Sequence, residues 1–266
     1  MFDQFNRRIN YLRISVTDRC NLRCVYCMPE DGIEQIPHNQ ILTFEEIVEI
    51  TKLAVKNGFE KVRITGGEPL VRKGIVELVK MIASIDGITD FGMTTNGVLL
   101  KQFAKPLFDA GLKRINVSLD TLDSDKYKAT TRIGNLSDVL EGLEEAKRVG
   151  FKPIKLNCVV EKSSEETDAQ AVKRFADENG FIARFIPKMN LDEGVFGVVD
   201  GGEGGNCATC NRLRLTANGI IKPCLFSDSG YNVRELGIER AIEMAIKNKP
   251  ACGVVNRTGE FYNIGG

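Results

Sequence analysis

Histidine is almost missing from this sequence of 266 residues, in which His38 is the only one. A metal site in this chain must therefore draw its ligands mainly from other side chains. An excess of one charge is missing too, because 36 Lys and Arg residues balance 36 Asp and Glu residues. This balance argues against a protein that binds nucleic acid by bulk positive charge, and we expect no such partner.

Long apolar runs are also absent, since no stretch approaches the roughly 18 residues that a membrane-spanning helix needs. The first residues, "MFDQFNRRIN", lack the apolar core of a signal peptide. We therefore expect a cytoplasmic protein with no membrane partner. Thiols stay reduced in that compartment, so clustered cysteines indicate metal binding or catalysis rather than disulfides.

Short β-rich runs alternate with amphipathic helical stretches over residues 11–188. Residues 43–57 and 137–149 are two such helices; Thr43 and Glu46 have the spacing of a capping box, and Gly58 is a helix stop. Alternating strands and helices predict an α/β fold with a parallel sheet and right-handed crossovers. Six units fit a partial (β/α)6 barrel of the TIM type, and a doubly wound open sheet is the alternative. The predicted strands are "YLRISV", "KVRITG", "DFGMTTN", "RINVSLD", "KPIKLNCVV" and "FIARFIP".

The composition changes after the last of these strands. Residues 191–206 contain six glycines in sixteen positions and indicate a flexible linker or loop. We expect a barrel over residues 1–190, this linker, and a small cysteine-bearing extension over residues 207–266.

The predicted strands place their apolar side chains on one face and polar side chains on the other. Helices must cover the apolar face, so the polar face points into the barrel. Buried cations without partners are costly, and they either pair with carboxylates such as Glu68 and Asp120, extend to the rim, or share an anionic ligand. Their number favours the shared ligand, and a polyphosphate fits best. These inward cations are Arg13, Lys61, Arg63, Lys155 and Arg184.

Three cysteines crowd into a C-x3-C-x2-C loop directly after the first strand: Cys20, Cys24 and Cys27. Iron–sulfur clusters take thiolates almost exclusively, and three ligands leave one iron of a cubane open. A zinc site that adds His38 is the alternative, although the spacing does not support it.

A second set, Cys207, Cys210 and Cys224, has the spacing C-x2-C-x13-C. It favours a second cluster, with a zinc ribbon as the alternative. Arg212 and Arg214 alternate just after Cys210, which indicates an anion nearby.

The first cysteine loop resembles that of the radical S-adenosylmethionine (radical SAM) superfamily. The segment "GGEP" after the second strand and Tyr26 between two of the cysteines match it as well. Together with "TTNGVLL", "RINVSLDTLD", "CNRLRL" and the terminal "IGG", the chain resembles the GTP 3′,8-cyclases that open molybdenum cofactor biosynthesis. The alternatives are a radical SAM enzyme acting on another nucleotide or on a peptide, and a zinc-binding interaction module.

The resemblance implies two [4Fe-4S] clusters, S-adenosylmethionine and GTP, with a 5′-deoxyadenosyl radical that removes hydrogen from ribose C3′ before C3′ joins C8 of guanine. It assigns the two cysteine triples to the two clusters. It gives Arg13, Arg63, Gly265 and Gly266 a part in catalysis. S-adenosylmethionine would contact Tyr26, Gly66, Gly67, Glu68, Ser118 and Met189. GTP would contact Arg13, Arg63, Thr94, Lys155, Arg212 and Arg214, with Lys61 and Arg184 nearby.

The resemblance also implies an external one-electron reductant, a homodimer, and a downstream enzyme that forms the cyclic pyranopterin. Family members are usually longer, and most of the shortfall lies between Met189 and Cys207. We therefore expect the guanine end of the pocket to differ more from the family than the triphosphate end. Two cysteines remain unassigned: Cys158 is expected in the core, and Cys252 in a partly buried loop, with a fourth ligand of the auxiliary cluster as the alternative for Cys252.

Overall fold

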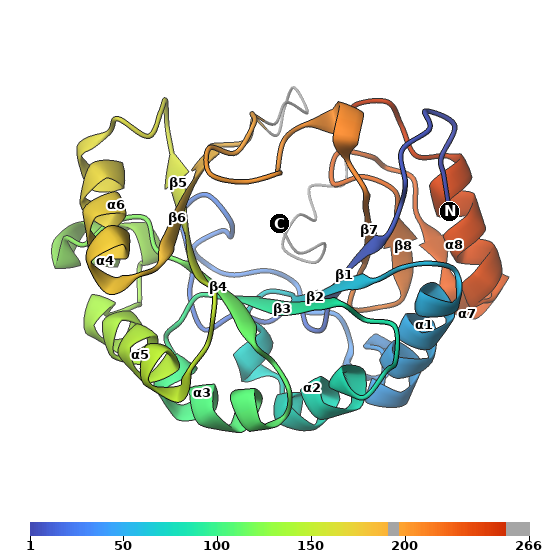
Figure 1. The fold of residues 1–266 in the computed structure, drawn as a ribbon, viewed down its shortest axis with the longest axis horizontal. Helices are drawn as coiled ribbons and strands as arrows, with labels where there is room; N and C mark the ends of the chain where they lie inside the picture. The colour runs from blue at the N-terminus through green and yellow to red at the C-terminus, as the bar shows by residue number, and fades with distance from the viewer. Residues whose placement is uncertain (191–196, 254–266) are drawn as a thin grey trace.

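The computed structural model describes residues 1–190 and 197–253, and one curved sheet organises them (Figure 1). Its nine strands lie in the order β6-β5-β4-β3-β2-β1-β7-β8-β9. The first six are parallel and follow one another around an arc. The α/β fold is confirmed, and the arc is a partial TIM-type barrel. These strands are β1 (Tyr11–Ser15), β2 (Lys61–Thr65), β3 (Asp90–Thr95), β4 (Arg114–Ser118), β5 (Ile154–Val160) and β6 (Ile182–Pro187).

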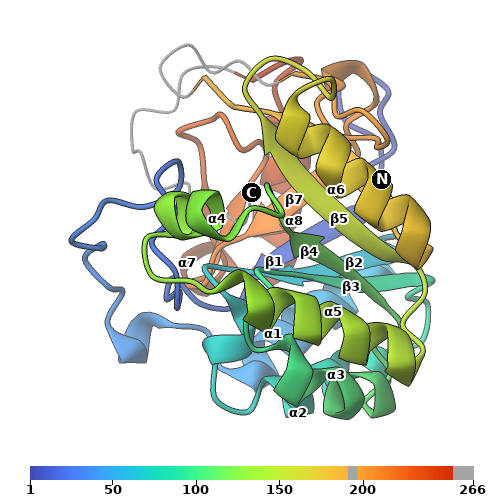
Figure 2. The ribbon, with the colours of Figure 1, turned by 90° about the vertical axis from the view of Figure 1, so that its left-hand side faces the viewer.

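Helices cover the outer face of this arc, as Figures 1 and 2 show from two sides. The predicted capping box exists, since the Thr43 hydroxyl accepts from the Glu46 backbone N–H and the Glu46 carboxylate accepts from the Thr43 N–H. The helices predicted over residues 43–57 and 137–149 are observed at Phe44–Lys56 and Leu136–Val149, so each end lies within one residue of its prediction. The helices are α1 (Phe44–Lys56), α2 (Ile75–Ala83), α3 (Leu100–Asp109), α4 (Ser124–Thr131), α5 (Leu136–Val149) and α6 (Thr167–Asn179), and the short 3-10 turns are η1 (His38–Gln40), η2 (Pro69–Val71) and η3 (Cys207–Thr209).

Strand alternation separates the core from the barrel interior as expected. Leu12, Ile14, Val62 and Ile64 are at most 1% exposed and pack toward the helices. Burying each such side chain contributes about 1.5–3 kcal/mol to folding. The polar side chains between them face the concave side of the sheet, which leaves room for chemistry inside the barrel.

The segment after Cys207 extends the same sheet. Strand β7 (Arg212–Leu215) pairs with β1 in parallel, and β8 (Ile220–Lys222) and β9 (Tyr231–Asn232) continue antiparallel. Helices α7 (Val233–Leu236) and α8 (Ile238–Lys247) then pack beside α1 (Figure 1). Before η3, Asp200 exchanges two backbone hydrogen bonds with Phe185 of β6. The described helices are all too short or too polar to span a lipid bilayer.

Candidate active site

The first cysteine loop leaves the carboxyl end of β1 and is fixed against the end of α4. The backbone N–H groups of Arg23 and Val25 donate to the carbonyls of Thr131 and Thr130 at 3.1 and 3.0 Å. The Arg132 guanidinium donates to the Arg23 carbonyl at 2.6 Å. These hydrogen bonds fix the conformation of the loop that carries the three thiols.

Burial disfavours the thiolate form of the first cysteines. Burial raises the pKa of Cys20 to about 11. Burial and the neighbouring Cys27 and Cys20 raise the pKa of Cys24 to about 12. Such thiols become thiolates at neutral pH only when nearby positive charge compensates them, and the irons of a cluster provide that charge. Among the described residues, no group of three or more Cys, His, Asp or Glu side chains converges on a single point, so the first loop is assigned by its cysteine spacing and not by preformed ligand geometry.

The two glycines after β2 allow that strand to meet the base of the cysteine loop. The Gly67 N–H donates to the Thr17 carbonyl at 2.7 Å, and the Glu68 N–H donates to the Arg19 carbonyl at 2.8 Å. A Cβ on Gly67 would lie 2.3 Å from the Arg19 carbonyl oxygen, and one on Gly66 would lie 2.7 Å from that of Thr17. The "GGEP" segment and the cysteine loop thus form one unit.

Glu68 is 1% exposed and joins the ends of β2 and β3. Its carboxylate accepts from the Thr95 hydroxyl at 2.8 Å and from the N–H groups of Asn96 and Leu70 at 2.6 and 3.0 Å. Burial raises its pKa to about 7 despite these hydrogen bonds. The Glu68 carboxylate thus accepts its hydrogen bonds from groups of the protein itself.

Two more residues of the predicted S-adenosylmethionine set lie along this end of the barrel, and one lies elsewhere. The Tyr26 hydroxyl donates to the Asp120 carboxylate at 2.7 Å, and Asp120 also accepts from the Val159 N–H at 2.8 Å. Ser118 is half-buried at the end of β4. Met189 instead packs with Leu225 and Phe226, beside Cys224. The structure therefore brings Met189 to the second cysteine set.

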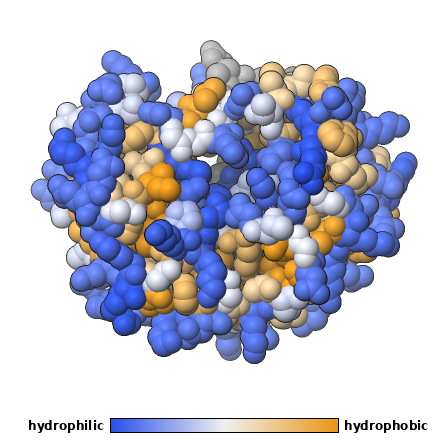
Figure 3. All heavy atoms as spheres, in the orientation of Figure 1, coloured by the Kyte–Doolittle hydropathy of each residue, from blue (hydrophilic) through white to orange (hydrophobic). Residues whose placement is uncertain are grey.

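Several predicted cations occupy neighbouring strands at the same height. Arg13 lies opposite Arg63 of β2 and Arg214 of β7, and these three are 9%, 7% and 8% exposed. The Tyr11 ring lies between the Arg63 and Arg212 guanidinium groups, 5.7 Å from each. Figure 3 shows hydrophilic residues around the hollow at the centre of this face. Alternation along the strands has thus placed the predicted cations together.

Protein carboxylates do not neutralise the centre of this cluster. Within residues 1–190 and 197–253, Arg63, Lys155 and Arg184 have no ion pair, and the Nε atoms of Arg63, Arg184 and Arg212 are buried without a hydrogen-bond partner, as is the Thr94 hydroxyl. Glu68 and Asp120, the expected partners, are engaged elsewhere. Burial and the charges of Arg184, Arg114 and Arg63 lower the pKa of Lys155 to about 8. The pairing alternative therefore fails here, and a polyanion fits the site.

The second cysteine set lies at the other end of the same strands. Cys210 precedes β7 and Cys224 follows the antiparallel β8, so both lie at the amino end of β7. Their cavity of about 80 Å³ is also lined by Cys207, Arg212, Arg214 and Lys249. Burial opposes ionisation of Cys210, but Lys249 and the Arg212 N–H outweigh it and lower its pKa. A set of thiols among cations fits an anionic cluster.

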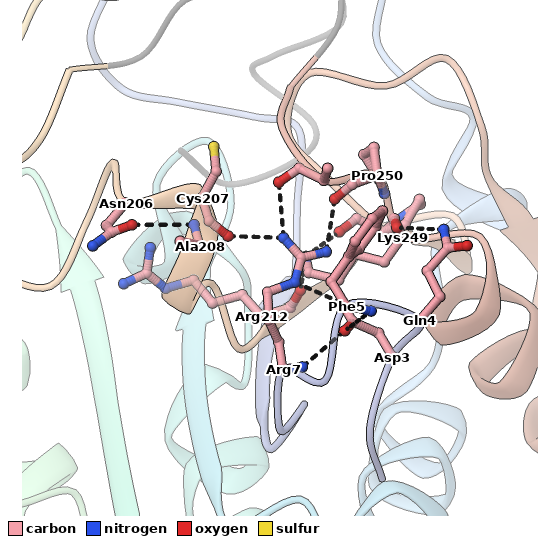
Figure 4. A network of polar contacts seen from close by, with 12 residues as sticks. Asp3, Gln4, Phe5, Arg7, Asn206, Cys207, Ala208, Arg212, Lys249 and Pro250 are labelled. Atoms are coloured by element: carbon pink, nitrogen blue, oxygen red, sulfur yellow. Dashed lines mark hydrogen bonds and ion pairs between the residues drawn. The ribbon is translucent and has the colours of Figure 1, made fainter.

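Two buried cations that the sequence did not reveal hold this second set in place (Figure 4). Arg7 donates to the carbonyls of Cys207, Pro250 and Ala251 at 2.8, 2.7 and 3.0 Å, and its Nε lies 2.6 Å from Asp3. Lys249 donates to the carbonyls of Arg212 and Pro223. Neither residue lies in a strand pattern, so no periodicity marks them in the sequence.

The remaining predicted residues are placed as follows. Cys158 is 1% exposed on β5, which confirms a core thiol. Cys252 is exposed rather than partly buried, and its thiol is hydrogen-bonded to that of Cys207, which raises the pKa of Cys252. Lys61 is half-buried at the start of β2. Gly265 and Gly266 lie outside the described residues.

Similarity to known proteins agrees with this arrangement of two cysteine sets around a cationic barrel. Residues 14–176 match the Radical SAM superfamily, and residues 152–254 match Molybdenum Cofactor Synthesis C. Streptococcus suis SuiB has a similar fold, with a TM-score of 0.66 and 18% identity over 93% of this chain and 68% of that one. Methylornithine synthase gives a TM-score of 0.56 at 17% identity over 94% and 76%. The chain is thus a radical SAM protein.

Its curated relatives define the family more closely. The GTP 3′,8-cyclase of Thermodesulfovibrio yellowstonii is 43% identical over 89% of this chain and 88% of its own. That of Geobacter sulfurreducens is 37% identical over 100% of this chain and 99% of its own. The chain belongs to the GTP 3′,8-cyclase family. The second alignment extends over 324 positions although this chain has 266 residues, so that relative has residues with no counterpart here.

Proposed function

We propose that this chain converts GTP to 3′,8-cyclo-7,8-dihydro-GTP in molybdenum cofactor biosynthesis. The observation that carries the proposal is that Arg63, Lys155 and Arg184, on neighbouring strands of the barrel, have no ion pair within the described residues. A nucleoside triphosphate places its phosphates on the cations and reaches toward both sets. GTP is the substrate that the names of the curated relatives give.

The residues of this chain divide the work. Cys20, Cys24 and Cys27 would hold one cluster, which together with S-adenosylmethionine would supply the 5′-deoxyadenosyl radical for hydrogen removal from ribose C3′. Gly66 and Gly67 bring backbone close to this loop. The strand cations bind the triphosphate through charge-assisted hydrogen bonds. The barrel wall orients the ribose and keeps water away from the reacting carbon.

At the other end of the barrel, Cys207, Cys210 and Cys224 would hold the auxiliary cluster, which would supply a binding site for the guanine. Arg212 and Arg214 line the same cavity, and Arg214 lies opposite Arg13, so both can bind phosphate or base oxygen atoms. Gly265 and Gly266 take part in catalysis in this proposal. Deleting both glycines then leaves the iron content unchanged and removes most product formation.

Anaerobic turnover with GTP, S-adenosylmethionine and a reductant tests the activity. We expect 5′-deoxyadenosine and a cyclised nucleotide in equal amounts, and ATP in place of GTP tests base specificity. Cys24→Ala abolishes both products, whereas Cys158→Ala, in the core, retains them. Cleavage of S-adenosylmethionine without cyclised GTP would favour a different nucleotide or a peptide substrate, and undiminished cleavage by Cys24→Ala would refute the radical assignment.

Three further features belong to the same proposal. The chain takes single electrons from an external reductant, works as a homodimer in the cytoplasm, and passes its product to the enzyme that forms the cyclic pyranopterin. Light scattering checks the dimer. A coupled assay with the downstream enzyme checks the product.

A further inference from the structure

Lys249 is a buried cation that links the two segments carrying Cys210 and Cys224. It is 2% exposed and lines the cavity at the second cysteine set. Its Nζ donates to the Arg212 carbonyl at 2.8 Å and to the Pro223 carbonyl at 2.6 Å. Arg212 lies two residues after Cys210, and Pro223 immediately precedes Cys224. One ammonium group therefore sets the separation of these two cysteines.

The charge of Lys249 is directed at the thiols. Lys249 lines the same cavity as Cys210 and Cys224, and its ammonium is attracted by both of these thiols. Among the residues that the structure describes, it has carbonyl and thiol partners but no carboxylate in an ion pair. Arg7, in the same network, differs because Asp3 neutralises it at 2.6 Å. A buried ammonium without a carboxylate is costly unless another anion compensates it.

We propose that Lys249 is a positioning residue for the auxiliary cluster and that its positive charge raises the reduction potential of that cluster. The inference rests on the proposed function, because it assumes that Cys207, Cys210 and Cys224 hold iron and sulfide. The reduced cluster carries one more negative charge than the oxidised cluster. A nearby cation therefore stabilises the reduced form more, and its removal makes the potential more negative.

Two substitutions separate charge from hydrogen bonding. Lys249→Gln keeps a donor for a backbone carbonyl and removes the charge, whereas Lys249→Arg keeps the charge. Lys247→Gln is the matched control, because Lys247 is exposed at the end of α8. Each chain is reconstituted anaerobically, and three quantities are measured: iron and sulfide per chain, the rate of iron loss to a chelator, and the midpoint potential of each cluster by paramagnetic resonance.

We expect Lys249→Gln to shift the auxiliary potential to more negative values and to lose that iron several-fold faster, with the other cluster unchanged. In Lys249→Arg and Lys247→Gln, we expect the auxiliary potential and the rate of iron loss to stay close to those of the unsubstituted chain. If Lys249→Gln takes up only one cluster, Lys249→Arg carries the test: an auxiliary potential and a rate of iron loss close to those of Lys247→Gln support the inference, and a potential shifted although the charge is kept overturns it. An unchanged potential and an unchanged rate in Lys249→Gln overturn the inference. Unsubstituted chain that binds iron at the first site alone instead overturns the auxiliary cluster itself.

Discussion

The cations on the concave face of the barrel differ in whether the protein neutralises them. Arg114 lies 2.5 Å from Asp90, while Arg63 and Lys155 have no ion pair within the described residues. Because Asp90 neutralises Arg114, that guanidinium attracts an anionic ligand only weakly. Arg63 and Lys155 keep their positive charge for binding an anion. In the proposed site, the phosphate end is therefore formed by Arg63 and Lys155, which have no ion pair within the described residues.

Replacing Arg63 or Lys155 by Ala tests this distinction. Each charge-assisted hydrogen bond contributes about 1.5–3 kcal/mol, so GTP binding weakens roughly tenfold to a hundredfold in each variant. Guanosine binding changes little, because guanosine has no phosphates. Calorimetry with both ligands measures the gap, and Lys113→Ala, whose ammonium lies over the Phe108 ring, is the control. Equal losses for GTP and guanosine would contradict the assignment.

The low pKa of Lys155, about 8, predicts a pH dependence of GTP binding. In the free enzyme Lys155 loses its proton as the pH rises through about 8, and phosphate binding requires the charged form. GTP affinity is therefore at its full value below that pH and falls by up to about tenfold per pH unit above it. Binding curves across this range measure the effect. Lys155→Arg removes the dependence, and an equally steep fall in that variant assigns it to another group.

Cys252 supplies a third prediction at this scale. Its exposed thiol interacts with Cys207, but in the proposed function only Cys207, Cys210 and Cys224 hold the auxiliary cluster. Cys252→Ser therefore retains the iron of both clusters and GTP cyclisation. Iron analysis after reconstitution checks this, with Cys224→Ser as the variant that loses the auxiliary cluster. Loss of the same iron from Cys252→Ser would make Cys252 a ligand.

At the scale of elements, the contact between the end of β2 and the cysteine loop leaves no room for a side chain. Gly67→Ala places a methyl group 2.3 Å from a backbone oxygen, so the loop must move. We expect loss of the first cluster's iron, with the auxiliary cluster retained. Iron and sulfide analysis with paramagnetic resonance measures this. Gly180→Ala is the control, because nothing lies within 4 Å of that Cβ and only its left-handed backbone is strained. Full first-cluster content in Gly67→Ala would show that the loop adapts.

The strands and their inward cations were predictable because a strand alternates its side chains with a period of two. That period assigned Arg13 and Arg63 to one face before any contact was known. Arg7 and Lys249 were not predictable. Their partners are backbone carbonyls in other segments, and Arg7 reaches Ala251 across 244 residues of sequence. Periodicity in a sequence reflects local secondary structure, and it does not indicate contacts between residues that are far apart in the chain.

At the scale of the whole molecule, Arg7 connects the amino-terminal segment to the second cysteine set through its hydrogen bond to the Cys207 carbonyl. Arg7→Met leaves Asp3 buried without its partner, which costs about 3–5 kcal/mol of unfolding free energy. We expect a lower midpoint of thermal unfolding and earlier loss of the auxiliary cluster than of the first. Arg8→Met is the control, since Arg8 is exposed and pairs with Glu60 at the surface. Equal midpoints of thermal unfolding for Arg7→Met and Arg8→Met would show that the contacts of Arg7 do not stabilise the fold.

The parallel pairing of β1 with β7 determines how far apart the two redox centres lie. The first cysteine loop follows the carboxyl end of β1, and Cys210 precedes the amino end of β7, so one strand length separates them. With about 3.3 Å per residue, the five residues of β1 span roughly 16 Å. Insertions in surface loops leave this span unchanged. A slip of β7 by two residues would lengthen or shorten it by about 6.6 Å, and an extended nucleotide would then touch only one centre.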